Sequence, residues 1–160
     1  MIPLREIAES WSAVYSNSAA IRSAVAFAHV GGLVAGGGTA VVADRATLRA
    51  IARGGEFVAT EVDRLQSAHR AVLAGLAVVS VSGVLLMLAN FDAFVVSAAF
   101  WIKMALVGAL LLHGAWLARV ASRTGPGGSR GWRALRVACV VSLLLWFATT
   151  LLGTVLPNVV

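Results

Sequence analysis

Four long apolar segments run through this chain, and nearly all of its charged residues lie between them. The segments cover residues of about 20–43, 68–89, 95–118 and 134–156. Because a hydrocarbon core about 30 Å thick takes roughly 20 helical residues to cross, each segment is long enough to be a transmembrane helix. The pattern predicts an all-α integral membrane protein. It is expected to be a four-transmembrane-helix bundle surrounded by the lipid bilayer, with residues 1–160 forming a single membrane domain.

A shorter amphipathic pattern precedes the first span. Apolar residues recur there at helical spacing: Ile7, Trp11, Val14 and Tyr15. They predict a short N-terminal helix that lies in the membrane interface. The charges around it, beginning with Arg5, are unlike the apolar core of a cleaved signal peptide. We therefore expect this segment to be part of the folded protein.

The composition supports the membrane class, because 59% of the residues are hydrophobic and only 12% are charged. Ten of the thirteen basic residues lie in or beside the first and third connections: Arg45, Arg49, Arg53, Arg64, Arg70, Arg119, Arg123, Arg130, Arg133 and Arg136. Lys and Arg near span ends are retained in the cytoplasm. Both termini and the short turn at residues 90–92 are therefore expected outside it. The net charge of +6 follows from this topology and predicts no binding of nucleic acid.

Polar and small residues of each span share one helical face, at the i, i+3, i+7 spacing of a left-handed bundle. The faces predicted to point inward are His29, Gly32, Gly36 and Thr39; His69, Leu73, Leu76, Ser80, Gly83 and Met87; Lys103, Leu106, Leu110 and His113; and Cys139, Ser142, Trp146, Thr149 and Gly153. Small and polar residues serve helix packing in any membrane bundle. Three histidines and a lysine exceed that need and indicate a binding function. Asp44, by contrast, is predicted to be a solvated charge at a helix end.

The depth of each polar residue decides which of them can meet. With a rise of 1.5 Å per residue, His69 lies at the cytoplasmic interface. Measured from that interface, His113 is about 9 Å deep and His29 is about 22 Å deep. His69 and His113 therefore form a candidate pair, whereas His29 stands apart toward the outer face. One metal ion bound by all three histidines would require a helix shift of about two turns.

Haem b is the first cofactor that this arrangement predicts. It needs one or two axial imidazoles, small residues beside the macrocycle, and cations for its propionates. His69 and His113, with Arg70 close by, fit a haem on the cytoplasmic side. His29, with Lys103 or Met104 opposite, marks a second candidate site. Lys103 either extends to water or binds an anionic group such as a haem propionate, a quinone oxygen or a lipid phosphate.

Copper is the alternative metal. Cu(I) prefers His, Cys and Met ligands, and two sets of these residues are available: His69, His113 and Cys139, or His29, Met87 and Met104. The sequence contains no Met-x-x-Met or Cys-x-x-Cys motif, and its single cysteine also fits a packing role. A third interpretation is that the histidines only bond neighbouring helices. The chain would then be an accessory subunit of a larger membrane complex, or a homo-oligomer in contact through the glycines of the first span.

Three stretches resemble small bacterial four-helix membrane proteins related to the copper-resistance CopD-type domain and to cytochrome b-like membrane proteins. They are AFAHVGGLVAGGGTAVVADR, SAHRAVLAGLAVVSVSGVLLML and FWIKMALVGALLLHGAWLAR. The shared features are a histidine ahead of glycines and a closing Asp-Arg, a Ser-Gly in the second span, and a Phe-x-x-Lys from Phe100 to Lys103. The resemblance implies a four-helix domain of the bacterial inner membrane with a haem-like or copper-related role.

The sequence as a whole predicts a membrane-embedded haem b-binding protein that passes electrons, with a quinol as candidate donor. Copper handling is the runner-up, and an accessory subunit without catalysis is the third possibility.

Overall fold

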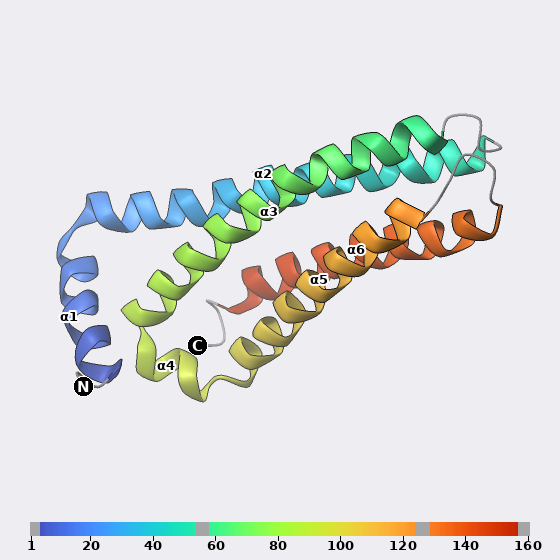
Figure 1. Cartoon of the computed structure of the whole chain (residues 1–160). Helices are drawn as coiled ribbons and strands as arrows, with labels where there is room; N and C mark the ends of the chain where they lie inside the picture. The colour runs from blue at the N-terminus through green and yellow to red at the C-terminus, as the bar shows by residue number, and fades with distance from the viewer. Residues whose placement is uncertain (1–3, 54–57, 124–128, 157–160) are drawn as a thin grey trace.

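The computed structural model describes residues 4–53, 58–123 and 129–156. Over these residues the chain is all-α, and its helices are α1 (Leu4–Asn17), α2 (Ala19–Ala52), α3 (Val58–Ala89), α4 (Phe91–Val96), α5 (Ala98–Arg123) and α6 (Ser129–Val155). Four of them, α2, α3, α5 and α6, are long and apolar enough to cross a membrane. They run side by side, with α1 and α4 at one end of the bundle (Figure 1). The predicted all-α class with four candidate spans is thus confirmed.

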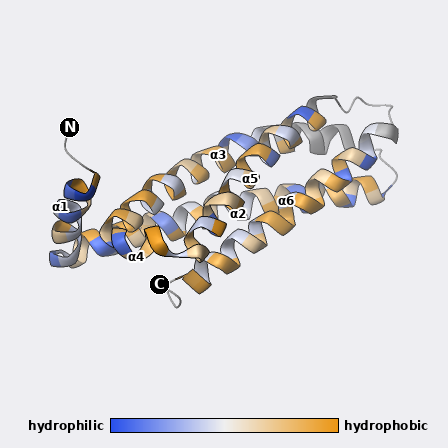
Figure 2. Ribbon diagram, turned by 90° about the horizontal axis from the view of Figure 1, so that it is seen from below, coloured by the Kyte–Doolittle hydropathy of each residue, from blue (hydrophilic) through white to orange (hydrophobic). Residues whose placement is uncertain are grey.

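The two ends of the bundle differ in character. We call the end with α1 and α4 the α4 end. The opposite end carries the connections between α2 and α3 and between α5 and α6, and its arginines are exposed: Arg45, Arg49, Arg53, Arg64, Arg70, Arg119, Arg133 and Arg136. We call it the arginine end. Large apolar side chains point outward between these ends, as for Phe27, Leu112 and Phe147, which are 80%, 76% and 67% exposed. Figure 2 shows orange, the colour of hydrophobic residues, along much of the ribbon of the long helices. Such a surface suits lipid contact.

The connection between the second and third spans differs from the predicted turn. Residues 91–96 form the short helix α4, and the third span begins at Ala98 rather than near residue 95. The hydroxyl of Ser97 accepts a hydrogen bond from the backbone N–H of Phe100 at 3.4 Å, which caps the new helix. The chain therefore turns twice here instead of once.

The first span also continues past its predicted end. Helix α2 runs without a break from Ala19 to Ala52, so residue 43 is not a boundary. The first connection thus begins as a continuation of this helix, and residues 54–57 lie outside the described residues. One consequence is that Asp44 sits inside a helix and is only 1% exposed. Its prediction as a solvated charge at a helix end was wrong.

Glycines set the closest helix contact, between α2 and α3. A Cβ atom added at Gly75 would lie 2.5 Å from the Cα atom of Gly36, which is too close for any side chain. A Cβ at Gly37 would lie 2.9 Å from the ring of Trp146 on α6. Helix α2 is therefore held tightly against α3 on one side and α6 on the other.

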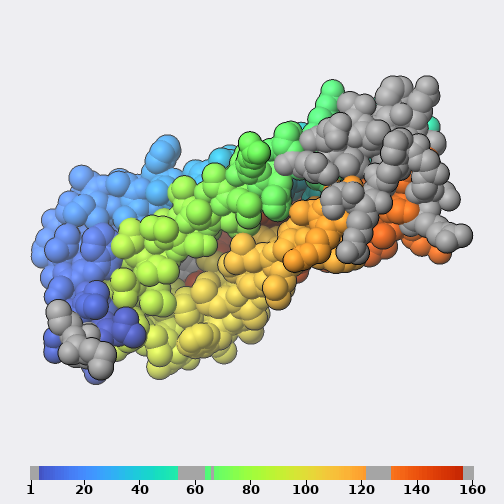
Figure 3. Space-filling view, in the orientation of Figure 1, coloured from blue at the N-terminus to red at the C-terminus, as the bar shows by residue number. Residues whose placement is uncertain are grey.

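The edge between α3 and α5 is packed much less closely. Figure 3 shows the surface hollowed between these two helices, with atoms of α6 visible at the floor. The bundle is thus open along the edge between α3 and α5.

Helix α1 packs across the α4 end of α3. The indole N–H of Trp11 donates to the carbonyl oxygen of Leu85 at 2.7 Å, and the hydroxyl of Ser12 donates to that of Ala89 at 2.9 Å. Arg5 forms an exposed ion pair with Asp92. The apolar residues Ile7 and Val14 remain about half exposed. The predicted short helix is therefore present, and its free apolar residues suit a position at the membrane surface.

Candidate functional site

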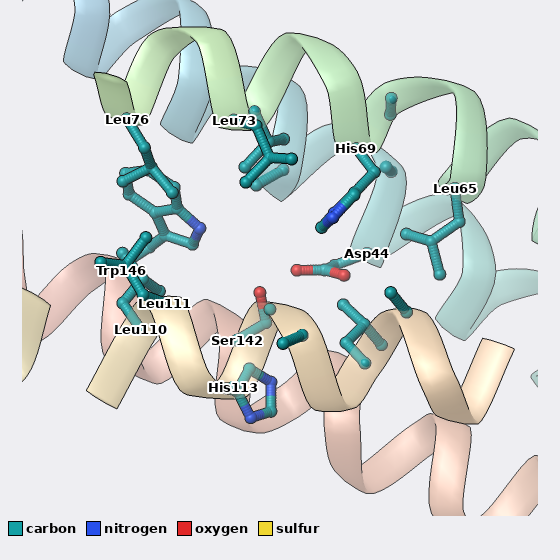
Figure 4. Close-up of a pocket in the computed structure, with 18 of the residues that line it drawn as sticks. Asp44, Leu65, His69, Leu73, Leu76, Leu110, Leu111, His113, Ser142 and Trp146 are labelled. Atoms are coloured by element: carbon teal, nitrogen blue, oxygen red, sulfur yellow. The ribbon is translucent and has the colours of Figure 1, made fainter. Parts of the chain in front are cut away.

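A cavity of about 490 Å³ lies between α2, α3, α5 and α6, in the half of the bundle nearer the arginine end. Its volume falls within the range of roughly 300–1,000 Å³ that is usual for small-molecule sites. Most of its wall is aliphatic, with Leu73 on α3 and Leu111 on α5 among the lining residues. The polar residues that line it are Asp44, His69, His113, Ser142 and Trp146 (Figure 4). We call this space the Asp44 cavity.

Asp44 is the most deeply buried polar residue of this cavity. The hydroxyl of Ser142 and the thiol of Cys139, both on α6, are its hydrogen-bonding neighbours. The Oδ2 atom has no hydrogen-bond partner among the described residues and no contact with solvent. Figure 4 shows the carboxyl group directed into the space between α3 and α5. A carboxylate oxygen without a partner in an apolar cavity is costly, and a ligand that donates a hydrogen bond would satisfy it.

His69 approaches the cavity from the opposite side. Its ring points from α3 toward Asp44 (Figure 4). Within the part of the chain that the structure describes, the two side chains form no ion pair. The indole nitrogen of Trp146 faces the same space. The cavity thus presents an anionic acceptor, an imidazole and an indole N–H donor to whatever occupies it.

His113 lines the same cavity, but its ring is turned away from His69 and Asp44 (Figure 4). Its Nε2 atom lies 2.9 Å from the carbonyl oxygen of Ala138 on α6. A carbonyl can only accept, so Nε2 donates this hydrogen bond. The structure therefore brings the predicted pair His69 and His113 to one cavity without turning their rings toward one point.

His29 lies apart from both, as its depth predicts. Its Nδ1 atom is 3.0 Å from the hydroxyl of Ser82, which itself donates to the carbonyl oxygen of Val78 at 2.6 Å. Because that bond uses the serine proton, the imidazole donates from Nδ1, and the backbone of Val79 is a further hydrogen-bonding neighbour of the ring. Lys103 acts electrostatically on this ring. The structure thus places Lys103 near His29, and both are half-buried.

The remaining predicted site residues are dispersed. Arg70 is exposed, Met104 is 39% exposed, Met87 is half-buried, and Cys139 is fully buried beside Asp44. Among the described residues, no three side chains of His, Cys, Asp or Glu form a cluster for one metal ion.

Sequence reasoning missed Asp44 and Ser82. The signal for Asp44 was present, because Gly36, Ala40 and Asp44 follow one another at intervals of four along a continuous helix. Ser82 was missed because the predicted stripe of the second span passed through Ser80, which is exposed, whereas Ser82 is 3% exposed.

The fold defines a class: an all-α protein with four helices fit to cross a membrane and a cavity among them. Comparison with family models, curated proteins and solved structures finds no match to this chain.

Proposed function

We propose that this chain is a membrane-embedded electron-transfer protein that binds a quinol from the bilayer in the Asp44 cavity. The observation that carries the proposal is the Oδ2 atom of Asp44, which is buried without a partner in an apolar cavity. A quinol hydroxyl is a donor of the kind that this acceptor lacks. The open edge between α3 and α5 offers a route from the lipid phase.

The other groups in the cavity suit the same ligand. A quinol head group has oxygens on opposite sides of its ring, and the cavity has polar groups on more than one side. Asp44 and His69 can accept the protons that leave when a quinol is oxidised, and Trp146 can donate to the second oxygen. Aliphatic residues such as Leu73 and Leu111 suit the apolar ring and tail.

Binding of a short-chain quinol to the detergent-solubilised protein tests this proposal, with calorimetry as the readout. Asp44→Asn should weaken binding about tenfold, because it replaces a charged acceptor by a neutral amide. Arg45→Gln is the matched control, since Arg45 is the next residue and is exposed. If Asp44→Asn and the natural protein bind the quinol with equal affinity, the Asp44 cavity is not the quinol site.

Haem b is the second component that we propose, as the acceptor of the electrons. It is supported by the rings of His29 and His113, since each has a nitrogen held by a hydrogen bond. Histidines that ligate metals are usually held in this way. When bound, haem b would supply one-electron chemistry.

An absorbance spectrum of the purified protein tests this component. A Soret band with α and β bands after reduction would support haem b, and His29→Ala or His113→Ala should abolish or shift it. A colourless preparation with stoichiometric copper would favour the copper alternative instead. A preparation with neither haem nor copper would contain no electron acceptor for a bound quinol. That result would point to an accessory subunit.

A further inference from the structure

A lysine ammonium group lies inside the bundle near its α4 end. Lys103 is on α5, five residues after Ala98, which places it about 8 Å from the start of that helix. Its Nζ atom would be 3.4 Å from a Cβ atom added at Gly153 on α6. The side chain therefore extends toward α6, and the missing side chain of Gly153 leaves room for it.

No acidic side chain in the described residues compensates this charge. The acidic residues described at the α4 end are Glu6, Glu9 and Asp92, which are exposed, and Arg5 pairs with two of them. Lys103 has no ion pair or hydrogen bond with any residue that the structure describes. A lysine within a membrane span normally has a partner, because the apolar surroundings solvate its charge poorly.

A second polar group close by also lacks a partner. The hydroxyl of Thr149 is buried, and no described residue forms a hydrogen bond with it. Thr149 precedes Gly153 by one helical turn on α6, so both lie on the same face. The ammonium group and a buried hydroxyl that lacks a partner among the described residues thus lie about one helical turn apart along the same face of α6.

From this arrangement we infer a binding site for the phosphate of an anionic phospholipid, formed by Lys103 and Thr149. A phosphate offers several strong acceptors for the ammonium group and the hydroxyl. The depth near the α4 end suits a lipid head group, and exposed apolar residues around it, such as Val96 and Ile102, suit acyl chains. This site is separate from the Asp44 cavity and does not depend on the function proposed for that cavity.

Native mass spectrometry of the detergent-solubilised full chain, titrated with phosphatidylglycerol or phosphatidylcholine, tests the inference. The natural protein should bind one phosphatidylglycerol in preference. Lys103→Gln should weaken that binding about tenfold, Thr149→Val should weaken it less, and Lys103→Arg should retain it. Arg136→Gln is the control, because this exposed arginine lies at the opposite end.

Equal loss in Lys103→Gln and Arg136→Gln would overturn the site, because it would show only general attraction of anionic lipid. Equal affinity of the natural protein and Lys103→Gln would overturn it as well. Titration with inorganic phosphate distinguishes the sources. If free phosphate saturates the site at the same concentrations as the lipid, the ligand is a soluble anion and not a phospholipid. Quinol affinity should be unchanged in Lys103→Gln, so the two proposals fail independently.

Discussion

Asp44 lies in an unbroken helix, and this position decides its chemistry. At the end of a span, the carboxylate would be solvated and would compensate nearby arginines. Inside the bundle it has Ser142 and Cys139 as neighbours and one oxygen atom without a partner. Such a group reduces the stability of the empty protein and is retained where a ligand uses it.

We therefore predict that Asp44→Asn stabilises the ligand-free protein while it weakens quinol binding. Removing a poorly compensated buried carboxylate should gain about 1 kcal/mol in the free energy of unfolding, or roughly 2–4 °C in the melting temperature of a chain of this size. Thermal unfolding in detergent, followed by circular dichroism, measures the change. Arg45→Gln should leave the melting temperature nearly unaltered. A lower melting temperature for Asp44→Asn would show that the carboxylate has stronger partners than its neighbours on α6.

The histidines show how far reasoning from single residues reaches. The depths estimated from the helical rise per residue correctly separated His29 from His69 and His113. They also placed Lys103 near His29. It could not predict how each ring is turned, because a ring's direction depends on which backbone carbonyl or hydroxyl lies within reach. His113 is turned by the carbonyl of Ala138, and His29 is held by Ser82.

Among the helices, the predicted interior face is correct on α6 and correct only in part on α3. The stripe on α6 from Cys139 to Gly153 is correct, since its first four members are at most 6% exposed and Gly153 is half-buried. The stripe on α3 is correct at Leu76 and wrong by Ser80. A straight helix drifts by about 20° per seven residues against a heptad spacing. Ser82, seven residues after Gly75, therefore stays on the face that contacts α2, whereas Ser80 lies about 200° of rotation away from Ser82.

At the level of helix pairs, the contact of α2 with α3 should be the most sensitive to added volume. Gly75→Ala places a methyl group 2.5 Å from the Cα atom of Gly36, where only backbone could yield. We expect it to lower stability by about 1–3 kcal/mol, as overpacking commonly does. Unfolding in a titration of denaturing detergent measures this loss. Gly38→Ala and Gly108→Ala are matched controls, because an added Cβ meets nothing within 4 Å at either position. Equal stability of Gly75→Ala and these controls would contradict the close crossing.

Across the whole molecule, the interior polar groups fall into two regions on either side of Trp146. Asp44 and His69 lie toward the arginine end, whereas His29, Ser82 and Lys103 lie toward the α4 end. The ring of Trp146 covers Gly37 and forms one wall of the Asp44 cavity. The bundle therefore has one cavity that opens between α3 and α5 and a second polar region closer to the α4 end.

The orientation of these regions in the membrane follows from the arginine end, for which we predict a cytoplasmic location. The single cysteine, Cys139, is fully buried and should not react with a maleimide, so the natural chain provides an unlabelled background. Introduced cysteines can then report each end. Ser10→Cys on α1 should react with a membrane-impermeant maleimide in intact spheroplasts, and Arg53→Cys should react only after permeabilisation, since both positions are exposed. Reaction of Arg53→Cys in intact spheroplasts, with protection of Ser10→Cys, would reverse the orientation. The Asp44 cavity would then lie toward the outer face, and the phosphate site of Lys103 would draw its lipid from the cytoplasmic leaflet.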